Sequence, residues 1–407
     1  MLRWWKRHGV LALGCMVWCA AQAAGQAPQA SGRLRYSGPW NVAELKQTPQ
    51  FERGPQAELV QQVFYEGEPL DGRPTRVFAY YAQPIEGEGP FPAMVLVHGE
   101  GGKAFPEWAT LWAQRGYAAL AMDLSGRGPD GQRLPDGGPE QGDRNKFKPF
   151  EADGVRETWE YHAVADVLRG VSLLSALSEV DPERIGATGI GWGGCLTCIA
   201  AGVDDRLKAV VPVYGGGFLY EDSIWLPTFR AMRPDDRKRW IENFDPSRYL
   251  PGVRCPMLFV SGANDYAFPL DSLQKSYQLV PGPVQLCIRV KMPHTHPDGW
   301  APKEIGRFVN GILKTGAPLS TISAPTIRGG EAIAEVKPTS RIRLAELHFA
   351  AASGEWSSRP WRTIPVRYHG NTVTAPLPPQ RPIVFMLTIT DERNAVVSSP
   401  HVVLEEP

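Results

Sequence analysis

The fold of this chain is decided by a short stretch, residues 185–194, with the sequence Ile-Gly-Ala-Thr-Gly-Ile-Gly-Trp-Gly-Gly. Its first part is strand-like, and its glycines lie where a helical segment, residues 193–201, begins. Glycines gathered at a strand-to-helix junction indicate a sharp turn, because strained backbone there suits a residue without a Cβ. The stretch therefore predicts an elbow between a strand and a helix.

On both sides of this elbow, buried strands alternate with amphipathic helices. Apolar runs predict strands at residues 93–97, 117–122, 185–189, 207–214, 257–261 and 286–291, and helical periodicity predicts helices at residues 108–115, 157–178, 193–201 and 303–313. Two earlier stretches, residues 59–65 and 75–81, predict a hairpin. This alternation predicts an α/β fold, with a mostly parallel sheet and helices on both faces.

The pattern changes after residue 317. Helical periodicity ends, and short alternating strands at residues 341–349, 363–368 and 382–390 are separated by turns that contain Gly, Pro or Asn. These features predict a small C-terminal β-sandwich at residues 318–407. We therefore expect an N-terminal tail with an edge segment at 25–56 and an α/β domain at 57–317.

The first 24 residues predict a signal peptide. Three basic residues before position 8 precede an apolar run, residues 9–21, which is too short to span a bilayer. Ala21-Gln22-Ala23 matches a small-x-small cleavage site. We expect cleavage after residue 23 or 24, and a periplasmic or secreted product that is not attached to the membrane.

Composition and charge restrict the class of protein. The 407 residues hold 43 Lys and Arg against 43 Asp and Glu, and this zero net charge argues against a general nucleic-acid binder. Hydrophobic residues make up 43% of the chain, as in an ordinary globular protein. Export would leave four cysteines that either pair in one of three connectivities or stay as buried thiols: Cys195, Cys198, Cys255 and Cys287.

Two further motifs combine with the elbow to predict a catalytic site. His98-Gly99-Glu100-Gly101-Gly102 follows a buried strand, and glycines there let backbone N–H groups turn inward, as an oxyanion hole requires. Asp265 follows the strand at 257–261, and His294 and His296 follow the strand at 286–291. A strand-to-helix turn for the nucleophile, then an acid, then a histidine is the chain order of the catalytic triad in hydrolases whose nucleophile lies on such a turn.

At these positions the chain resembles a known family. Residues 95–99, 115–119, 184–194 and 292–296 are similar to motifs of the acetylxylan-esterase-like and dienelactone-hydrolase-like group of the α/β-hydrolases. The resemblance extends over residues 57–315, and the C-terminal sandwich resembles appendages found in that group. It implies an α/β-hydrolase fold and hydrolysis of acyl esters on carbohydrates, and we expect no cofactor.

One position departs from the family pattern. The family elbow is Gly-x-Ser-x-Gly-Gly, and Gly191 stands where the serine belongs. In another serine hydrolase, loss of the nucleophile costs about six decades in kcat, or roughly 8 kcal/mol. We therefore expect a shaped site with impaired or absent ester hydrolysis, in which Asp265 orients His296 as the base. His294 is the alternative histidine, and His296 is preferred because it lies deeper in the loop.

Backbone N–H groups are expected to form the oxyanion hole. Trp192 provides one of them and Glu100 or Gly101 the other. The family more often has glycine at Glu100, whose carboxylate would crowd the oxyanion and repel its charge. Cys195, one helical turn after the elbow, and Thr188, within the strand, are expected to face the packed interior and not to replace the serine.

Other interpretations of the same residues stay open. Gly189-x-Gly191-x-x-Gly194 matches a dinucleotide fingerprint, although the next strand ends without the carboxylate that this motif requires. His294 and His296 with Asp298 resemble a metal site, but we favour one catalytic histidine with one packing or capping partner and no metal. The main alternative to an enzyme is a binding or scaffold protein that keeps a glycan-shaped cleft without turnover.

Overall fold

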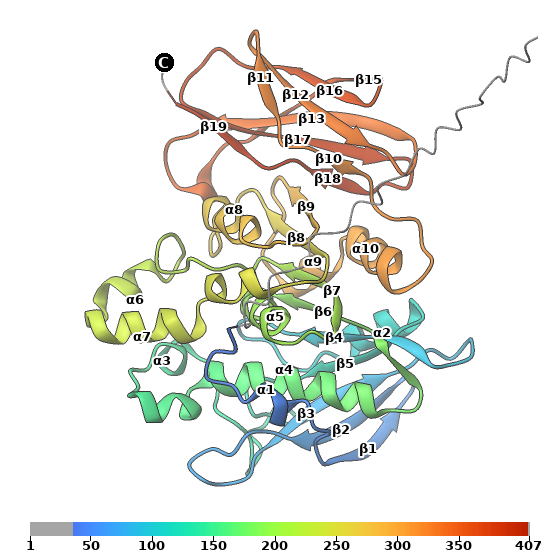
Figure 1. The fold of residues 1–407 in the computed structure, drawn as a ribbon, viewed down its shortest axis with the longest axis vertical. Coiled ribbons are helices and arrows are strands. Elements are labelled where there is room, and N and C mark those ends of the chain that lie inside the picture. Colours follow the sequence, from blue (N-terminus) through green and yellow to red (C-terminus); the bar gives the residue numbers. More distant parts are fainter. Residues whose placement is uncertain (1–35, 406–407) are drawn as a thin grey trace, which may run out of the picture. The chain divides into compact units, whose positions relative to one another are not determined.

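The computed structural model describes residues 36–405 (Figure 1). The predicted signal peptide and its cleavage site lie outside these residues. The largest sheet has nine strands in the order β1-β2-β3-β5-β4-β6-β7-β8-β9. Its strands are β1 (Phe51–Ala57), β2 (Val60–Glu66), β3 (Arg76–Ala82), β4 (Phe91–Val97), β5 (Ala118–Met122), β6 (Val180–Ile190), β7 (Leu207–Val213), β8 (Met257–Gly262) and β9 (Val284–Arg289).

This sheet confirms the predicted strands and hairpin. β2 pairs antiparallel with β3, with Phe64 opposite Phe78, and β3 pairs antiparallel with β5. The six strands in the order β5-β4-β6-β7-β8-β9 run parallel to one another. β5 and β8 are buried throughout, which explains why β5 and the first four residues of β8 are continuously apolar. β1 pairs with β2 and begins at Phe51, so the sheet already starts inside residues 25–56.

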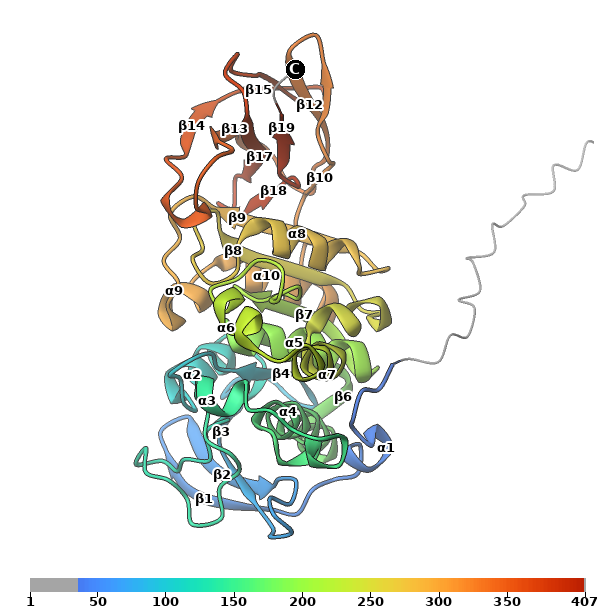
Figure 2. The same cartoon turned by 90° about the vertical axis from the view of Figure 1, so that its left-hand side faces the viewer.

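Helices cover both faces of the sheet. Gly170 of α4 (Trp159–Ala176) lies close to Leu120 on one face, and Leu313 of α10 (Lys303–Leu313) lies close to Gly186 on the other. In Figure 2, α2 and α4 lie on opposite sides of β4. The remaining helices are α1 (Val42–Leu45), α2 (Pro106–Gln114), α3 (Asp143–Lys146), α5 (Trp192–Val203), α6 (Leu226–Ala231), α7 (Pro234–Phe244), α8 (Leu270–Gln278) and α9 (His296–Trp300), with 3₁₀ turns at Ala152–Glu157, Pro246–Arg248, Leu250–Gly252 and Trp356–Ser358.

The helices between β7 and β8 were not predicted. α7 has a well-formed start, with Pro234 at its first position and two aspartates in its first turn. Its buried apolar residues are Trp240 and Phe244, so the apolar stripe is too short to give a clear helical period. Tertiary contacts of these two rings therefore stabilise a helix whose sequence pattern is weak.

The C-terminal region forms two antiparallel sheets of five strands each. The predicted strand at 363–368 is in fact two strands that belong to different sheets, because Arg362–Pro365 pairs with β13 and Arg367–His369 pairs with β16. One sheet comprises β10 (Thr321–Ile322), β11 (Thr326–Arg328), β12 (Glu331–Lys337), β15 (Arg367–His369) and β16 (Thr372–Pro376); the other comprises β13 (Ile342–Ala351), β14 (Arg362–Pro365), β17 (Ile383–Asp391), β18 (Val396–Ser398) and β19 (Val402–Leu404).

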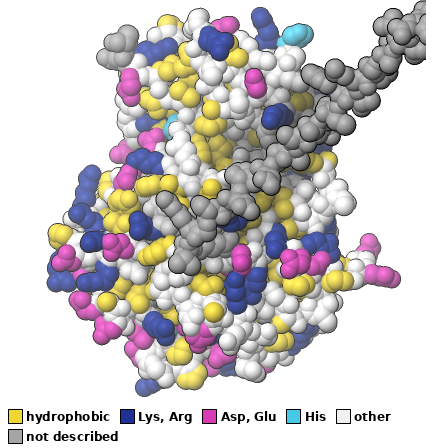
Figure 3. All heavy atoms as spheres, viewed as in Figure 1, with side chains coloured by type: hydrophobic (Ala, Val, Ile, Leu, Met, Phe, Trp, Pro, Cys, Tyr) yellow, Lys and Arg dark blue, Asp and Glu magenta, His cyan; other side chains and the backbone are white. Residues whose placement is uncertain are grey.

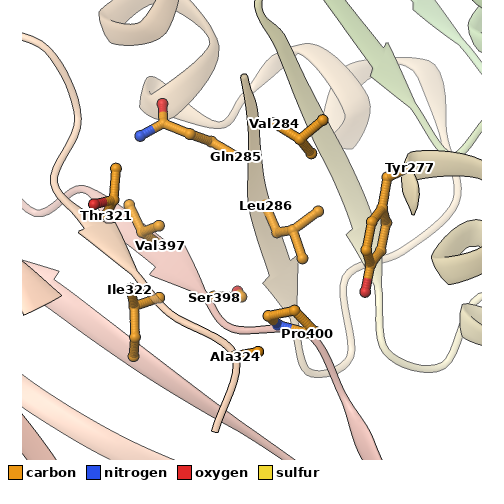
Figure 4. Close-up of a pocket in the computed structure, with 10 residues that line it drawn as sticks. All are labelled: Tyr277, Val284, Gln285, Leu286, Thr321, Ile322, Ala324, Val397, Ser398 and Pro400. Carbon is orange, nitrogen blue, oxygen red and sulfur yellow. The ribbon is translucent and has the colours of Figure 1, made fainter. Parts of the chain in front are cut away.

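The C-terminal strands contact the edge of the large sheet at β9. Ser398 of β18 accepts a hydrogen bond from the Ile288 N–H (2.8 Å) through its hydroxyl. A cavity of about 190 Å³ lies at this junction and contains none of the predicted site residues. Figure 4 shows its lining: Tyr277, Val284, Gln285, Leu286, Thr321, Ile322, Ala324, Val397, Ser398 and Pro400.

The surface carries both signs of charge. Acidic and basic side chains are mixed over the face shown in Figure 3, in agreement with the equal numbers of the two in the sequence. Within residues 36–405, no helix has the length and apolar character needed to cross a bilayer.

Candidate functional site

The predicted site residues follow four parallel strands at the same edge of the sheet. Gly99 and Glu100 follow β4, Gly191 follows β6, Asp265 follows β8 and His294 follows β9. The carboxyl ends of parallel strands meet at one edge, where α/β proteins form their binding sites. The topology therefore brings together residues that lie up to about 195 positions apart in the chain.

Gly191 forms the predicted elbow. Its backbone has φ 58° and ψ −118°, between the end of β6 and the first residue of α5. The Gly191 N–H donates a hydrogen bond to the carbonyl of Val213 (2.8 Å), which fixes the turn against β7. A Cβ built on Gly191 would lie 3.1 Å from Nε2 of His294. The elbow thus presents position 191 directly to an imidazole nitrogen.

His294 and Asp265 form an oriented pair. Nδ1 of His294 lies 2.8 Å from Oδ2 of Asp265. The other carboxylate oxygen of Asp265 accepts the N–H groups of Ala267 (2.9 Å) and Phe268 (2.8 Å), so the carboxylate is held in place. The His294 ring stacks on Tyr214, with ring centres 4.4 Å apart. Because the carboxylate accepts the Nδ1 proton, the Nε2 lone pair faces position 191, as a general base requires.

The structure corrects our preference for His296. Nε2 of His296 accepts the backbone N–H of Gly99 (3.0 Å), and its ring packs against Phe105. Burial, followed by the nearby charges of His98 and His294, lowers the pKa of His296 to about 4. His296 is therefore a neutral acceptor that holds the loop after β4, and the position expected of the catalytic histidine belongs to His294. His296 is also the first residue of α9, after the capping residue Thr295.

Glu100, in the loop after β4, has different surroundings from those that we expected. Its carboxylate forms an ion pair with Lys146, whose side chain is fully buried and also lies 2.9 Å from Asp143. The negative charge that we expected to repel an oxyanion therefore has a cationic partner. The N–H of Gly99 is committed to His296, so Glu100 and Gly101 remain the loop donors, opposite the Trp192 N–H at the start of α5.

The Trp192 side chain belongs to an aromatic cluster. Its indole is buried, and the ring centres of Trp225 and Trp159 lie 5.0 and 5.8 Å away. The Lys146 ammonium lies 4.8 Å from the Trp192 ring centre, where a cation is attracted by the face of the ring. The sequence gives no signal for Lys146, because this residue lies in the polar segment between β5 and α4 and only packing buries it.

The two candidate replacements for the serine do not face the elbow. The Cys195 thiol donates to the carbonyl of Gly216 (3.2 Å), and its complete burial raises its pKa far above the ordinary value. The Thr188 hydroxyl donates to the carbonyl of Val211 (2.9 Å) within the sheet. Neither group is a nucleophile in this arrangement, since a buried thiol stays protonated and inert. Cys198 and Cys287 are also buried free thiols.

The contacts at this site favour neither a dinucleotide nor a metal ion as its ligand. The α5 N-terminus, where a pyrophosphate would bind, faces His294 across Gly191, and the residue after β7 is Tyr214 rather than a carboxylate. The two imidazoles have separate partners, Asp265 for His294 and the Gly99 N–H for His296. Asp298 accepts the Thr295 hydroxyl (2.6 Å) instead of approaching either ring.

Comparisons with known proteins identify the fold of this chain. The acetyl xylan esterase (AXE1) family profile matches residues 42–221, which include the loop after β4 and the elbow. An acetyl xylan esterase from Paenibacillus sp. R4 superposes with a TM-score of 0.54 at 23% identity, covering 67% of this chain and 92% of that one. Acetyl Xylan Esterase 1 from Thermoanaerobacterium sp. JW/SL YS485 gives a TM-score of 0.50 at 18% identity, covering 64% and 91%. These two superpositions show that the chain has the α/β-hydrolase fold.

The profile match relates the chain to carbohydrate acetyl esterases. A putative carboxymethylenebutenolidase of Methylorubrum extorquens is 26% identical over 199 residues, which cover 48% of this chain and 59% of that protein. The acetyl esterase Axe7A of Xylanibacter ruminicola is 20% identical over 224 residues, which cover 52% of this chain and 51% of that protein. The chain spans about half the length of the curated relatives that it matches.

Proposed function

We propose that this chain is an exported relative of the carbohydrate acetyl esterases whose ester hydrolysis is impaired because Gly191 replaces the nucleophilic serine. The observation that carries the proposal is the 3.1 Å between a Cβ at position 191 and Nε2 of His294. A serine hydroxyl on that Cβ would meet the base, and Asp265 would orient the base. The base and its orienting acid would therefore act on a serine at position 191, which this chain lacks.

The remaining groups support only slow hydrolysis. His294 Nε2 would take a proton from a water molecule whose oxygen attacks the acyl carbonyl, and the resulting oxyanion would accept the Trp192 N–H. Collapse of the intermediate would break the ester bond, with the proton passing from His294 to the departing sugar hydroxyl. Water lacks the fixed position of a serine hydroxyl on the elbow, so this route loses the advantage of a tethered nucleophile.

Export and ligand class belong to the same proposal. The basic segment, the apolar run and the cleavage site at Ala21-Gln22-Ala23 support a periplasmic or secreted product. The relatives named as acetyl xylan esterases support an acetylated carbohydrate as the ligand. The alternative, a glycan-binding protein without turnover, uses the same cleft and differs only in the absence of product.

Acetate release from 4-nitrophenyl acetate tests the proposal. We expect the natural mature chain to stay near the uncatalysed rate and Gly191→Ser to exceed it at least about 100-fold, a small part of the roughly six decades that a nucleophile contributes. Gly191→Ala is the matched control, because it adds the Cβ without the hydroxyl. Strong hydrolysis by the natural chain would refute the proposal, and so would a folded but inactive Gly191→Ser.

A further inference from the structure

The carboxylate that orients His294 lies in a segment without regular secondary structure. β8 ends at Gly262 and α8 begins at Leu270, and Asp265 belongs to the irregular connection between them. Strands and helices fix their residues through ladders of backbone hydrogen bonds, whereas such a connection depends on contacts with the rest of the molecule. The position of Asp265 therefore depends on what holds residues 264–271, which we call the acid loop.

The acid loop forms much of the surroundings of the His294 ring. Oδ2 of Asp265 lies 2.8 Å from its Nδ1, and the ring centres of Tyr266 and Phe268 lie 5.3 and 6.1 Å from the imidazole centre. The second oxygen of Asp265 accepts the N–H groups of Ala267 (2.9 Å) and Phe268 (2.8 Å) within the same loop. These internal bonds tie the carboxylate to the loop. A shift of the loop therefore moves the carboxylate with it.

The C-terminal region holds the first end of the acid loop. The side-chain amide nitrogen of Asn264, the residue before Asp265, lies within hydrogen-bond distance of three backbone carbonyls in the connection between β13 and β14. These carbonyls belong to Trp356 (3.3 Å), Ser357 (3.2 Å) and Arg359 (2.9 Å). Carbonyl oxygens only accept hydrogen bonds, so this contact requires a side chain that donates.

The C-terminal region also holds the other end of the loop. The Trp356 indole donates to Oδ2 of Asp271, in the first turn of α8 (3.1 Å), and Nε2 of His401 lies 3.1 Å from Oδ1. The hydrogen bond from His401 lowers the pKa of Asp271, so the carboxylate accepts as an anion, and hydrogen bonds of this charged kind are the stronger ones. Trp356 itself is buried beneath the Arg359 guanidinium, which lies 3.6 Å from its ring centre.

The strand that leads to His294 contacts the same region. The Ser398 hydroxyl of β18 accepts the Ile288 N–H (2.8 Å) and donates to the Ile288 carbonyl (3.1 Å) in β9. Figure 1 and Figure 2 both show α8 and β9 next to the C-terminal strands. The supports of Asp265 and of His294 are therefore bound to one structure.

We propose that the C-terminal region is a positioning element for the Asp265–His294 pair, with Asn264 as its main positioning residue. Catalytic groups must keep their geometry within about 0.5 Å, and a misplacement of about 1 Å can cost about 100-fold in rate. This gives a role to a region beyond residues 42–221, where the family profile matches. The inference rests on the proposed function in one respect, namely that the pair acts on an ester.

The proton between His294 and Asp265 tests the inference without turnover. In the natural mature chain with ¹⁵N-labelled histidine, the Nδ1–H signal of His294 lies far downfield because a carboxylate accepts it, and His294→Gln identifies it by its loss. We expect Asn264→Ala and Asp271→Ala to speed the exchange of this proton with water about 10-fold, because a loop with fewer hydrogen bonds opens more often. Asn243→Ala is the matched control, since that amide donates to a carbonyl within α7.

Thermal unfolding of each variant shows whether it folds. If Asn264→Ala does not fold, Asp271→Ala, at the half-exposed end of the loop, gives the same test. A purely structural role would lower the unfolding temperature and leave the exchange unchanged. Unchanged exchange in the folded variants, an equal change in Asn243→Ala, or absence of the downfield signal from the natural chain would overturn the inference.

Kinetics in the Gly191→Ser background separate this inference from the proposed function. We expect Asn264→Ala to lower kcat for 4-nitrophenyl acetate at least about 10-fold and to leave KM within about twofold, because Asn264 acts through Asp265 and not on the substrate. Inactivity of Gly191→Ser would refute the proposed function and leave proton exchange as the test of the positioning role. An active Gly191→Ser whose kcat Asn264→Ala does not change would refute the positioning role alone.

Discussion

The two histidines after β9 become distinguishable once a serine stands at position 191. In the Gly191→Ser chain, we expect His294→Ala to abolish hydrolysis of 4-nitrophenyl acetate and His296→Ala to leave at least about a tenth of it. His294 Nε2 lies 3.1 Å from the Cβ position at 191, whereas His296 Nε2 already accepts the Gly99 N–H. Only the first nitrogen can take a proton from the new hydroxyl.

The expected magnitudes follow from these contacts. Loss of a catalytic histidine costs about six decades in kcat, or roughly 8 kcal/mol, in a well-studied serine protease. His294→Ala should therefore return Gly191→Ser to the rate of the natural chain. His296→Ala leaves one backbone N–H without its acceptor, which costs about 1–3 kcal/mol of stability. Even if about 1.4 kcal/mol of this reached the transition state, the rate would fall only about tenfold.

The assay compares initial rates of the natural chain, Gly191→Ser, Gly191→Ala and the two histidine variants in the serine background. Thermal unfolding of each variant is the control for folding, because any side chain at φ 58° costs about 1–3 kcal/mol. Gly191→Ala carries the same strain and should stay inactive. Activity that survives His294→Ala, or that His296→Ala removes from a folded protein, would refute the assignment of His294 as the base.

Three other predictions concern buried groups around the site and in the C-terminal region. Burial raises the pKa of Glu160 to about 8, so the folded state holds a proton that the unfolded state releases above about pH 4.5. The free energy of unfolding should therefore fall as pH rises from 4.5 to 8. Urea unfolding of Glu160→Gln should show a smaller fall over this range, and a fall equal to that of the natural chain would contradict this prediction. Burial lowers the pKa of His348 to about 4, so its contribution is lost as pH falls from 6.5 to 4, and His348→Gln should weaken that acid dependence. Iodoacetamide should modify Cys195 only after unfolding, and modification of the native chain would show that its thiol is accessible.

The alternation of strands and helices could be predicted from sequence because it depends on local periodicity. The runs that form β4, β5 and the first four residues of β8 are apolar because both faces of a central parallel strand are buried. The elbow was predictable for a similar local reason, because the glycines of residues 189–194 allow backbone conformations that other residues rarely adopt. α6 and α7 were missed because packing against the aromatic cluster, rather than their own pattern, stabilises them.

The partners of charged side chains could not be predicted in this way. Lys146 meets Glu100 across 46 positions of sequence, and the ion pair depends on how the segment after β5 folds over the Trp192 ring. The Asn264 amide donates hydrogen bonds to the carbonyls of Trp356, Ser357 and Arg359, which lie more than 90 positions further along the chain. Such contacts leave no local pattern, because each residue alone resembles an ordinary surface residue.

The sequence by itself determined the α/β fold, the elbow at residues 189–194 and the glycine at the nucleophile position, since these features follow from hydrophobic periodicity, from backbone freedom and from the identity of one residue. Only the tertiary structure decided between His294 and His296. The two lie two positions apart in one loop, and the choice depends on which ring reaches the Asp265 carboxylate and which reaches the Gly99 N–H. Those two groups are positioned by β8 and β4, so the chemistry of each histidine is set by the packing of the sheet.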